Sequence, residues 1–328
     1  MAPIKSSLAR TASKLLGVQK DTDLSLRGDV QSLRIPPPFS ASGGNQEVSP
    51  GNGYKYHTFT SPGNFTVSGQ PGPVEILIVA GGGGAGAPLG SGGGGGGVVH
   101  APNRTLAAGV YPIVVGDGGA GATGEGTPGV DNTPGSRGGD STANGLTAVG
   151  GGGGHPYYND TDIAPNQMPG GSGGGGGGTS TQASANPGVS GISQYGNAGG
   201  SAGDPLGGGG GGAGAVGTNG SSPASPTGDG DGGNGQQFPN FTGPLIGVPG
   251  LNPHSGYYGG GGGSGSRSTA TSGGLGGGGA NPGDSNSGTN GATNTGGGAG
   301  GGSYMSSRAG NTAADGGSGI VVIRYTVS

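Results

Sequence analysis

Aromatic and imidazole side chains stand beside several of the glycine runs in this sequence. One group follows directly on the run at 150–154, another leads into the run at 259–263, and a third lies in the segment between two runs. Flat aromatic faces with hydrogen-bonding tips are suited to gripping a sugar or a protein surface. The alternative is that these rings cap and shield the ends of the glycine-rich part, or pack against sister subunits. The candidate binding residues are His155, Tyr157, Tyr158, Phe238, Phe241, His254, Tyr257 and Tyr258.

Catalytic chemistry finds little support in the residue types and their spacing. The chain has no Cys, and its four His are scattered singly without carboxylates at ligand spacing. No nucleophile stands with a base, and there is no pair of carboxylates suited to hydrolysis. Matches to G-x-G-x-x-G arise by chance in so glycine-rich a chain, and no helical pattern follows the one after residues 74–80. We therefore expect no enzyme and no cofactor.

A calcium site is the remaining chemical alternative. The segments 116–119 and 228–233 combine Asp with Gly, as calcium-binding nonapeptide repeats do, but they lack the fixed nine-residue period. Turn formation by Asp and Gly explains them more simply. We expect no metal site.

The composition limits how such side chains can be positioned. Of 328 residues, 95 are Gly and 25 are Pro, while hydrophobic residues make up 27% and charged residues 9%. Ordinary domains are about 45–50% apolar and about 25% charged, so no single conventional core can hold this chain. The net charge of −4 is too small for charge-driven disorder. It also lacks the excess of basic residues that is typical of nucleic-acid binding. No apolar run is long enough for membrane insertion.

The N-terminal part differs from the rest. Residues 1–34 hold half of the basic residues, and apolar side chains recur there near helical spacing, with Gly17 where a helix C-cap would stand. We predict a short amphipathic helix that docks on a partner; the alternative is a frayed terminus. Residues 35–53 read as a linker that begins with an extended Pro-rich spacer. The candidate docking residues are Ile4, Leu8, Arg10, Leu15 and Leu16.

Strand patterns occur in two widely separated places. Residues 54–149 contain several short apolar or Thr-rich runs, among them 54–60, 74–80 and 110–115. Residues 320–327 form one more run, which has too few local partners to make a sheet alone. We predict a β-sandwich over 54–149, an insertion over 150–318, and a closing strand over 319–328 that pairs with strands from 54–115.

The glycine runs have irregular spacing, which excludes collagen. A glycine segment can adopt an extended helix of about three residues per turn, polyglycine II, and neighbouring helices can then pack through backbone contacts alone. We predict such a bundle within the insertion. The runs lie at 81–84, 92–97, 150–154, 173–178, 207–212, 259–263, 276–279 and 296–302.

These segments suggest a family. The N-terminal MAPIKSSLARTASKLLGVQKDTDLSLRG, with YKYHTFTSPGNFTV, VEILIVAGGGGAG, GVYPIVVGDGG and GSGIVVIRY, resembles glycine-rich structural proteins of tailed bacteriophages, especially those of marine hosts. The glycine runs with variable segments between them look like tail-fibre tip adhesins, in which polyglycine II helices carry host-binding loops. A sandwich with a glycine-helix insertion is also similar to the glycine-rich domain of anaplastic lymphoma kinase, which has a tumour-necrosis-factor-like sandwich. The chain departs from the tip adhesins in its N-terminal helix and its closing strand.

The resemblance implies a mainly β protein, with a jelly-roll or tumour-necrosis-factor-like sandwich and an inserted polyglycine II bundle. It implies a virion protein, a tail fibre or adhesin, that attaches to other virion proteins through residues 1–34. Its loops would bind a host receptor, either a glycan or an outer-membrane protein, and the protein would be a homotrimer. The alternative is a capsid fibre, a decoration protein or a tail-assembly protein with no adhesive role.

Overall fold

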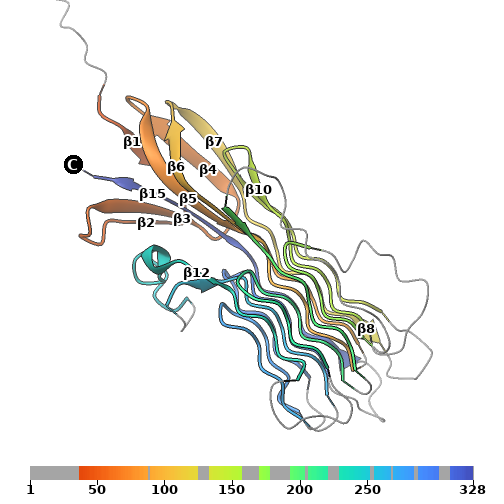
Figure 1. The fold of residues 1–328 in the computed structure, drawn as a ribbon. Coiled ribbons are helices and arrows are strands. Elements are labelled where there is room, and N and C mark those ends of the chain that lie inside the picture. Colours follow the sequence, from red (N-terminus) through yellow and green to blue (C-terminus); the bar gives the residue numbers. More distant parts are fainter. Residues whose placement is uncertain are drawn as a thin grey trace, which may run out of the picture.

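The computed structural model is an elongated, mainly β molecule (Figure 1). The helix expected within residues 1–34, with Ile4, Leu8, Arg10, Leu15 and Leu16, lies outside the described residues. The described residues are 37–87, 89–124, 133–156, 170–177, 193–203, 206–220, 229–251, 255–266, 269–283, 287–302 and 311–327.

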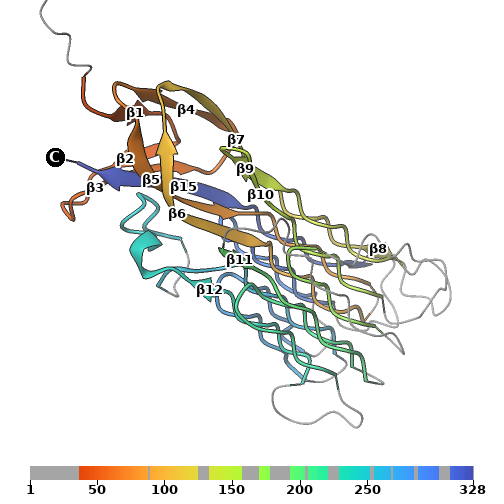
Figure 2. The same ribbon diagram turned by 45° about the horizontal axis from the view of Figure 1, so that its top comes forward.

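Two antiparallel sheets face each other at one end of the molecule and are called the sandwich below (Figures 1 and 2). The five-stranded sheet has the order β1 (Ser40–Ser42), β4 (Gly63–Ser68), β7 (Gly109–Val114), β9 (Ser141–Ala143), β10 (Leu146–Ala148). The six-stranded sheet has the order β11 (Ser193–Tyr195), β6 (Val98–Leu106), β5 (Gly72–Val79), β15 (Ile320–Thr326), β3 (Tyr54–Phe59), β2 (Gln46–Val48). The smaller elements are β12 (Gln236–Gln237) with β13 (Tyr257–Tyr258), β8 (Thr123–Gly124) with β14 (Asn311–Thr312), and the 3-10 helix η1 (Pro239–Phe241).

The main core lies between the two sheets. Phe65, Ile76, Ile113 and Ile323 are buried there, each from a different strand, and they alternate with residues that face outward. Strands β5 and β15 are buried on both faces along most of their length, as their nearly continuous apolar runs predict. The outward-facing apolar side chains of these two strands therefore need a second cover.

The predicted return of the closing strand is confirmed. Strand β15 lies between β3 and β5, and Val322 is in register with Thr58 on one side and Leu77 on the other. The predicted linker over 35–53 is only partly a linker, because β1 and β2 add edge strands to the two sheets. Strand β11, from the predicted insertion, extends the six-stranded sheet at its other edge.

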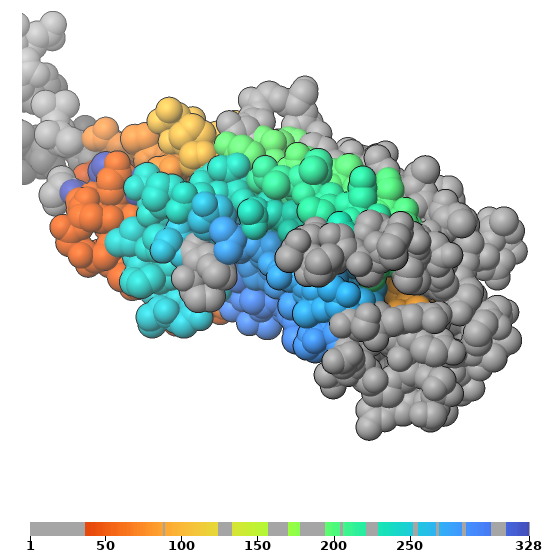
Figure 3. Space-filling view, turned by 60° about the horizontal axis from the view of Figure 1, so that its bottom comes forward, coloured from red at the N-terminus to blue at the C-terminus, as the bar shows by residue number. Residues whose placement is uncertain are grey.

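Residues 236–251, called the cap segment, cover the outer face of the six-stranded sheet. Phe238, Phe241, Ile246 and Leu251 from this segment pack against apolar residues of β3, β5, β6 and β15 in a second core. In the space-filling view the cap segment, coloured teal, lies directly against the orange strands of the sandwich (Figure 3). The sheet is thus buried on both faces, which accounts for its apolar strands.

The glycine-rich segments run side by side away from the sandwich and back, and are called the glycine body (Figures 1 and 2). Residues 91–97, the central tract, show how the segments are joined. The Gly94 amide donates to Gly152 O at 2.8 Å, and three residues on, the Gly97 amide donates to Val149 O at 2.8 Å. The neighbours that exchange backbone hydrogen bonds with the central tract are 80–86, 149–155, 172–175, 211, 262 and 296–299.

The bonding pattern repeats every three residues. The Gly93 amide reaches Ala299 O at 2.9 Å and the Gly96 amide reaches Gly296 O at 2.7 Å, while the Gly95 amide between them reaches Gly211 O at 2.8 Å. Successive amides therefore point to different neighbours, and every third amide returns to the same one. An outer segment shows the same repeat in its exposure, because Asp117, Ala120 and Thr123 face solvent.

The body has a core made of backbone, and this explains its composition. A Cβ atom added to Gly93, Gly94 or Gly95 would overlap carbonyl groups of Gly83, Ser172 and Gly259 respectively. Side chains are therefore excluded from the centre. Hydrogen bonds between segments replace the apolar contacts of an ordinary core, because most of the buried amides donate to carbonyl groups of neighbouring segments.

Both ends of the described chain lie at the sandwich end of the molecule. Pro37 O accepts a hydrogen bond from the Gln70 amide at 2.9 Å, and the Val327 amide donates to Gly53 O at 3.0 Å. The glycine body extends the other way (Figure 1). Within the described part of the chain, no helix is long and apolar enough to cross a bilayer.

Candidate functional site

The predicted binding residues are not one surface cluster in this structure. Tyr157, Tyr158 and His254 lie outside the described residues. His155 is 4% exposed at the end of the segment 149–156, and its Nδ1 pairs with Pro156 O at 2.8 Å. Burial lowers the pKa of this imidazole, although the Pro156 carbonyl opposes the change. His155 thus belongs to the interior of the glycine body.

The expected exposure is also wrong for three of the aromatic residues. Phe238, Phe241 and Tyr258 are buried in the second core, and the Tyr258 hydroxyl donates to Phe241 O at 2.5 Å. Burial raises the pKa of Tyr258. Tyr257 is half-buried on the same two-residue strand. The physical reason is that the outer face of the six-stranded sheet is apolar and takes up the nearest rings, which favours the capping alternative for these residues.

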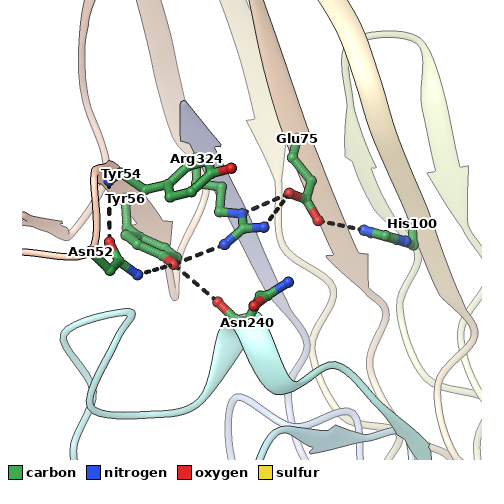
Figure 4. A network of polar contacts seen from close by, with 7 residues as sticks. All are labelled: Asn52, Tyr54, Tyr56, Glu75, His100, Asn240 and Arg324. Carbon is green, nitrogen blue, oxygen red and sulfur yellow. Dashed lines mark hydrogen bonds and ion pairs between the residues drawn. The ribbon is translucent and has the colours of Figure 1, made fainter. Parts of the chain in front are cut away.

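A network of polar side chains lies where the cap segment meets the six-stranded sheet (Figure 4). Three neighbouring strands supply three of its members: Glu75 on β5, His100 on β6 and Arg324 on β15. Arg324 Nε donates to Glu75 Oε2 at 2.7 Å and Nη2 lies 2.6 Å from the same oxygen. His100 Nε2 lies 2.8 Å from Glu75 Oε1. Both carboxylate oxygens are therefore occupied.

Tyr56 connects this charge cluster to the cap segment. Arg324 Nη1 donates to the Tyr56 hydroxyl at 3.0 Å, and that hydroxyl donates to Asn240 O at 3.2 Å. Asn52 Nδ2 donates to the same hydroxyl at 3.0 Å. The guanidinium also lies over the Tyr54 ring, 4.2 Å from its centre. The network thus ties four strands of the six-stranded sheet and a turn of the sandwich to η1.

The network favours the charged form of both ion-pair members. Burial acts to raise the pKa of Glu75, but hydrogen bonds from His100 and Arg324 outweigh it and hold the pKa below its ordinary value of 4.5. Burial acts to lower the pKa of Arg324, and the hydrogen bonds with Tyr56 and Glu75 raise it instead. Glu75 is 15% exposed and Arg324 7%, so solvent screens the pair little.

This arrangement can hold surfaces together, because each of its members already contacts another member. Among the described residues no group of three or more His, Cys, Asp or Glu could hold a metal ion.

The network was not predicted from the sequence, although a signal was present. Glu75 and Arg324 are each a single charged residue in an otherwise apolar strand. A charge in a strand that is buried on both faces requires a partner, so two such strands predict an ion pair if they are neighbours. Only the pairing of β15 with β5 makes them neighbours.

The sequence model of a family described as a glycine-rich domain matches residues 58–326. The matched range includes most of the sandwich and the whole of the glycine body. A search of curated proteins found no match.

Proposed function

This chain belongs to the glycine-rich domain family, and we propose that it is a structural protein of a bacteriophage virion that binds the host cell surface. In this proposal it is a tail fibre or adhesin and has no enzymatic role. Residues 1–34 attach it to other virion proteins. Loops between the glycine segments contact a glycan or an outer-membrane protein of the host.

The observation that supports this proposal most is that the two ends of the described chain lie at one end of the molecule and the glycine body at the other. The described chain begins and ends at the sandwich, and the glycine body projects away from that end. A segment before Pro37 that attaches to the particle would leave the far end of the body directed outward. The segment 149–156 runs toward that far end, and Tyr157 and Tyr158 follow it in sequence. These two tyrosines are our leading candidates for host contact.

The glycine segments are best explained as polyglycine II helices. Their hydrogen bonds return to the same neighbour every third residue, which is the repeat of that helix. We further propose a jelly-roll or tumour-necrosis-factor-like topology for the sandwich, in keeping with its two antiparallel sheets. A homotrimer completes the proposal, and light scattering of the purified protein would test it against the chain mass of 30.2 kDa.

Adsorption of phage particles tests the adhesin role. We expect the double substitution Tyr157→Ala and Tyr158→Ala to lower adsorption at least tenfold while the protein is still incorporated. Val216→Ala is the matched control, because Val216 is an exposed side chain, 61% accessible, in another segment of the glycine body. Unchanged adsorption and host range in the double variant would exclude these tyrosines as the host contact.

A second candidate function is a non-adhesive capsid fibre, decoration protein or tail-assembly protein. The burial of Phe238, Phe241 and Tyr258 favours it, since aromatic residues near the glycine runs then serve packing. Under this function, removal of residues 1–34 abolishes incorporation into the particle, whereas substitutions in the loops change neither assembly nor adsorption.

A further inference from the structure

His57 lies in the main core and takes no part in the network or the proposed host contact. It is in the middle of β3 and fully buried. Its ring stacks on Tyr325 of β15 with a centroid distance of 5.7 Å, and meets the edge of Phe65 of β4 at 5.1 Å. An ionisable group here has no access to solvent.

One nitrogen of this ring holds the turn between β1 and β2. His57 Nδ1 lies 2.7 Å from Gly43 O, so Nδ1 carries the proton and donates it to the carbonyl. Gly43 has φ +113°, and its amide donates to Glu47 Oε1 at 2.9 Å. Tyr325, which stacks on the imidazole, also receives a hydrogen bond from the Ala41 amide of β1 at 3.3 Å. His57 and Tyr325 together fix residues 40–48, called the edge segment, which adds β1 to one sheet and β2 to the other.

The other nitrogen has no partner. Nε2 is buried without a hydrogen bond, and the neutral tautomer leaves it as an acceptor lone pair. Protonation would place a donor and a positive charge at this atom, where no described group accepts either. A buried charge without a partner is strongly unfavourable. When the edge segment is packed on the sandwich, the ring of His57 is therefore neutral.

The charged and titratable groups around His57 do not relieve this cost. From β2, Glu47 Oε1 lies 3.7 Å from Nδ1, on the side of the ring away from Nε2, and Glu47 is already paired with Lys55 of β3 at 2.8 Å. From β15 the facing group is the Tyr325 phenol, and from β4 it is the uncharged Phe65.

We propose that His57 is an acid-sensitive latch, which keeps residues 40–48 on the sandwich while neutral and releases them when it is protonated. The edge segment follows residues 37–39, which are themselves held because the Gln70 amide donates to Pro37 O. Release would therefore loosen one of the attachments between the N-terminal segment and the rigid part of the molecule, a property that holds whether or not the protein is an adhesin.

The direction of the pH dependence follows from burial. Burial lowers the pKa of His57 below its ordinary value of 6.5, and the hydrogen bond to Gly43 and the carboxylate of Glu47 oppose this only in part. When the edge segment is released, the ring of His57 is exposed to solvent and its pKa returns to the ordinary value of 6.5. Above pH 6.5 neither state binds the proton, so the latch has its full stability, and it weakens as the pH falls below 6.5.

Hydrogen exchange of the full chain, corrected for the intrinsic rate at each pH, tests the latch. Between pH 7.5 and pH 5 we expect amides of residues 40–48 to lose protection at least tenfold relative to β5 and β15. In His57→Gln, which keeps a donor for Gly43 O and cannot titrate, this extra loss should disappear. Glu47→Gln should retain it, because the unpartnered Nε2 is unchanged.

Two results would overturn the proposal: equal acid loss of protection in wild type and His57→Gln, or no loss in wild type. If His57→Gln does not fold, nitrogen chemical shifts of the wild-type imidazole decide the matter. We expect the ring to stay neutral, with its proton on Nδ1, until the amides of residues 40–48 lose their protection from exchange. A His57 that becomes charged while residues 40–48 stay protected would contradict the latch.

Discussion

Among the ion pairs of the described residues, the pair between Arg324 and Glu75 is the one whose loss should lower the free energy of unfolding most. Substituting Glu75→Gln leaves the guanidinium buried without a counter-ion, and breaking a buried pair in this way costs about 3–5 kcal/mol. Because Gln can still accept one hydrogen bond, we expect the free energy of unfolding to fall by about 3 kcal/mol. Denaturant unfolding of the purified protein measures the difference.

Lys55→Ala provides the control for this prediction. Lys55 and Glu47 also lie 2.8 Å apart, but their side chains are 27% and 37% exposed. Exposed pairs contribute about 0–1 kcal/mol. The role assigned to the buried pair would be untenable if Glu75→Gln cost no more than Lys55→Ala.

Sequence reasoning at this scale identified residue types and missed their surroundings. The aromatic residues next to glycine runs are predicted to be exposed binding residues, yet Phe238, Phe241 and Tyr258 are buried. Their cover, the six-stranded sheet, is assembled from distant strands, so nothing local revealed it. The Glu75 and Arg324 pair was missed for the same reason, because 249 positions separate the two residues.

The central tract makes a sharp prediction about single elements. Gly95→Ala would drive a methyl group into the backbone of Gly259, and backbone on every side leaves little room to relax. Overpacking of a tight core costs about 1–3 kcal/mol and sometimes more. We expect at least the upper end of that range, measured as a lower melting temperature.

Gly250→Ala is the matched substitution outside the tracts. No atom lies within 4 Å of a Cβ placed there, so its melting temperature should stay within about a degree of wild type. Equal tolerance at Gly95 and Gly250 would show that the body is not held by close backbone packing.

The cap segment supports a second prediction at the scale of elements. Phe241 is 1% exposed, and its ring lies 6.4 Å from that of Tyr56 and 5.1 Å from the Arg324 guanidinium. Replacing a buried Phe by Ala costs about 3–5 kcal/mol. In Phe241→Ala we expect amide protection to fall first in residues 236–251, with strands β4 and β7 retaining theirs. A uniform loss across both sheets would mean that the cap is not a separate cover.

Elements were predicted unevenly, and the difference has a physical cause. Strands with continuous apolar runs, such as 74–80 and 320–327, were placed correctly because burial on both faces leaves a plain sequence pattern. Segments 115–123 and 133–140 were not predicted as parts of the glycine body, since they carry Asp, Ser, Thr and Arg. At the surface of the body every third residue faces solvent, so only the inward positions require Gly or Ala. A search for unbroken runs therefore finds the centre of the body and misses its outside.

At the scale of the whole molecule, the sandwich and the glycine body share their chain without a break. Strand β5 continues directly into residues 80–87, and residues 313–319 lead directly into β15. Segments of the body are also hydrogen-bonded to one another close to the sheet, where the Gly319 amide donates to Gly116 O at 2.9 Å. Neither part presents an independent boundary at which one could unfold while the other stays intact.

This continuity predicts one cooperative unfolding transition. Most of the described tyrosines lie in or against the sandwich, so near-UV circular dichroism reports on that part, whereas exchange of the amides in residues 91–97 reports on the body. We expect both probes to give the same midpoint, because removing β15 from between β3 and β5 also frees the segment that the body packs against. Glu75→Gln should lower both midpoints equally, although the side chain of Glu75 bonds to His100 and Arg324, which belong to the sandwich. Two separate midpoints, or a shift confined to the tyrosine signal, would instead identify the body as a unit held by its own hydrogen bonds.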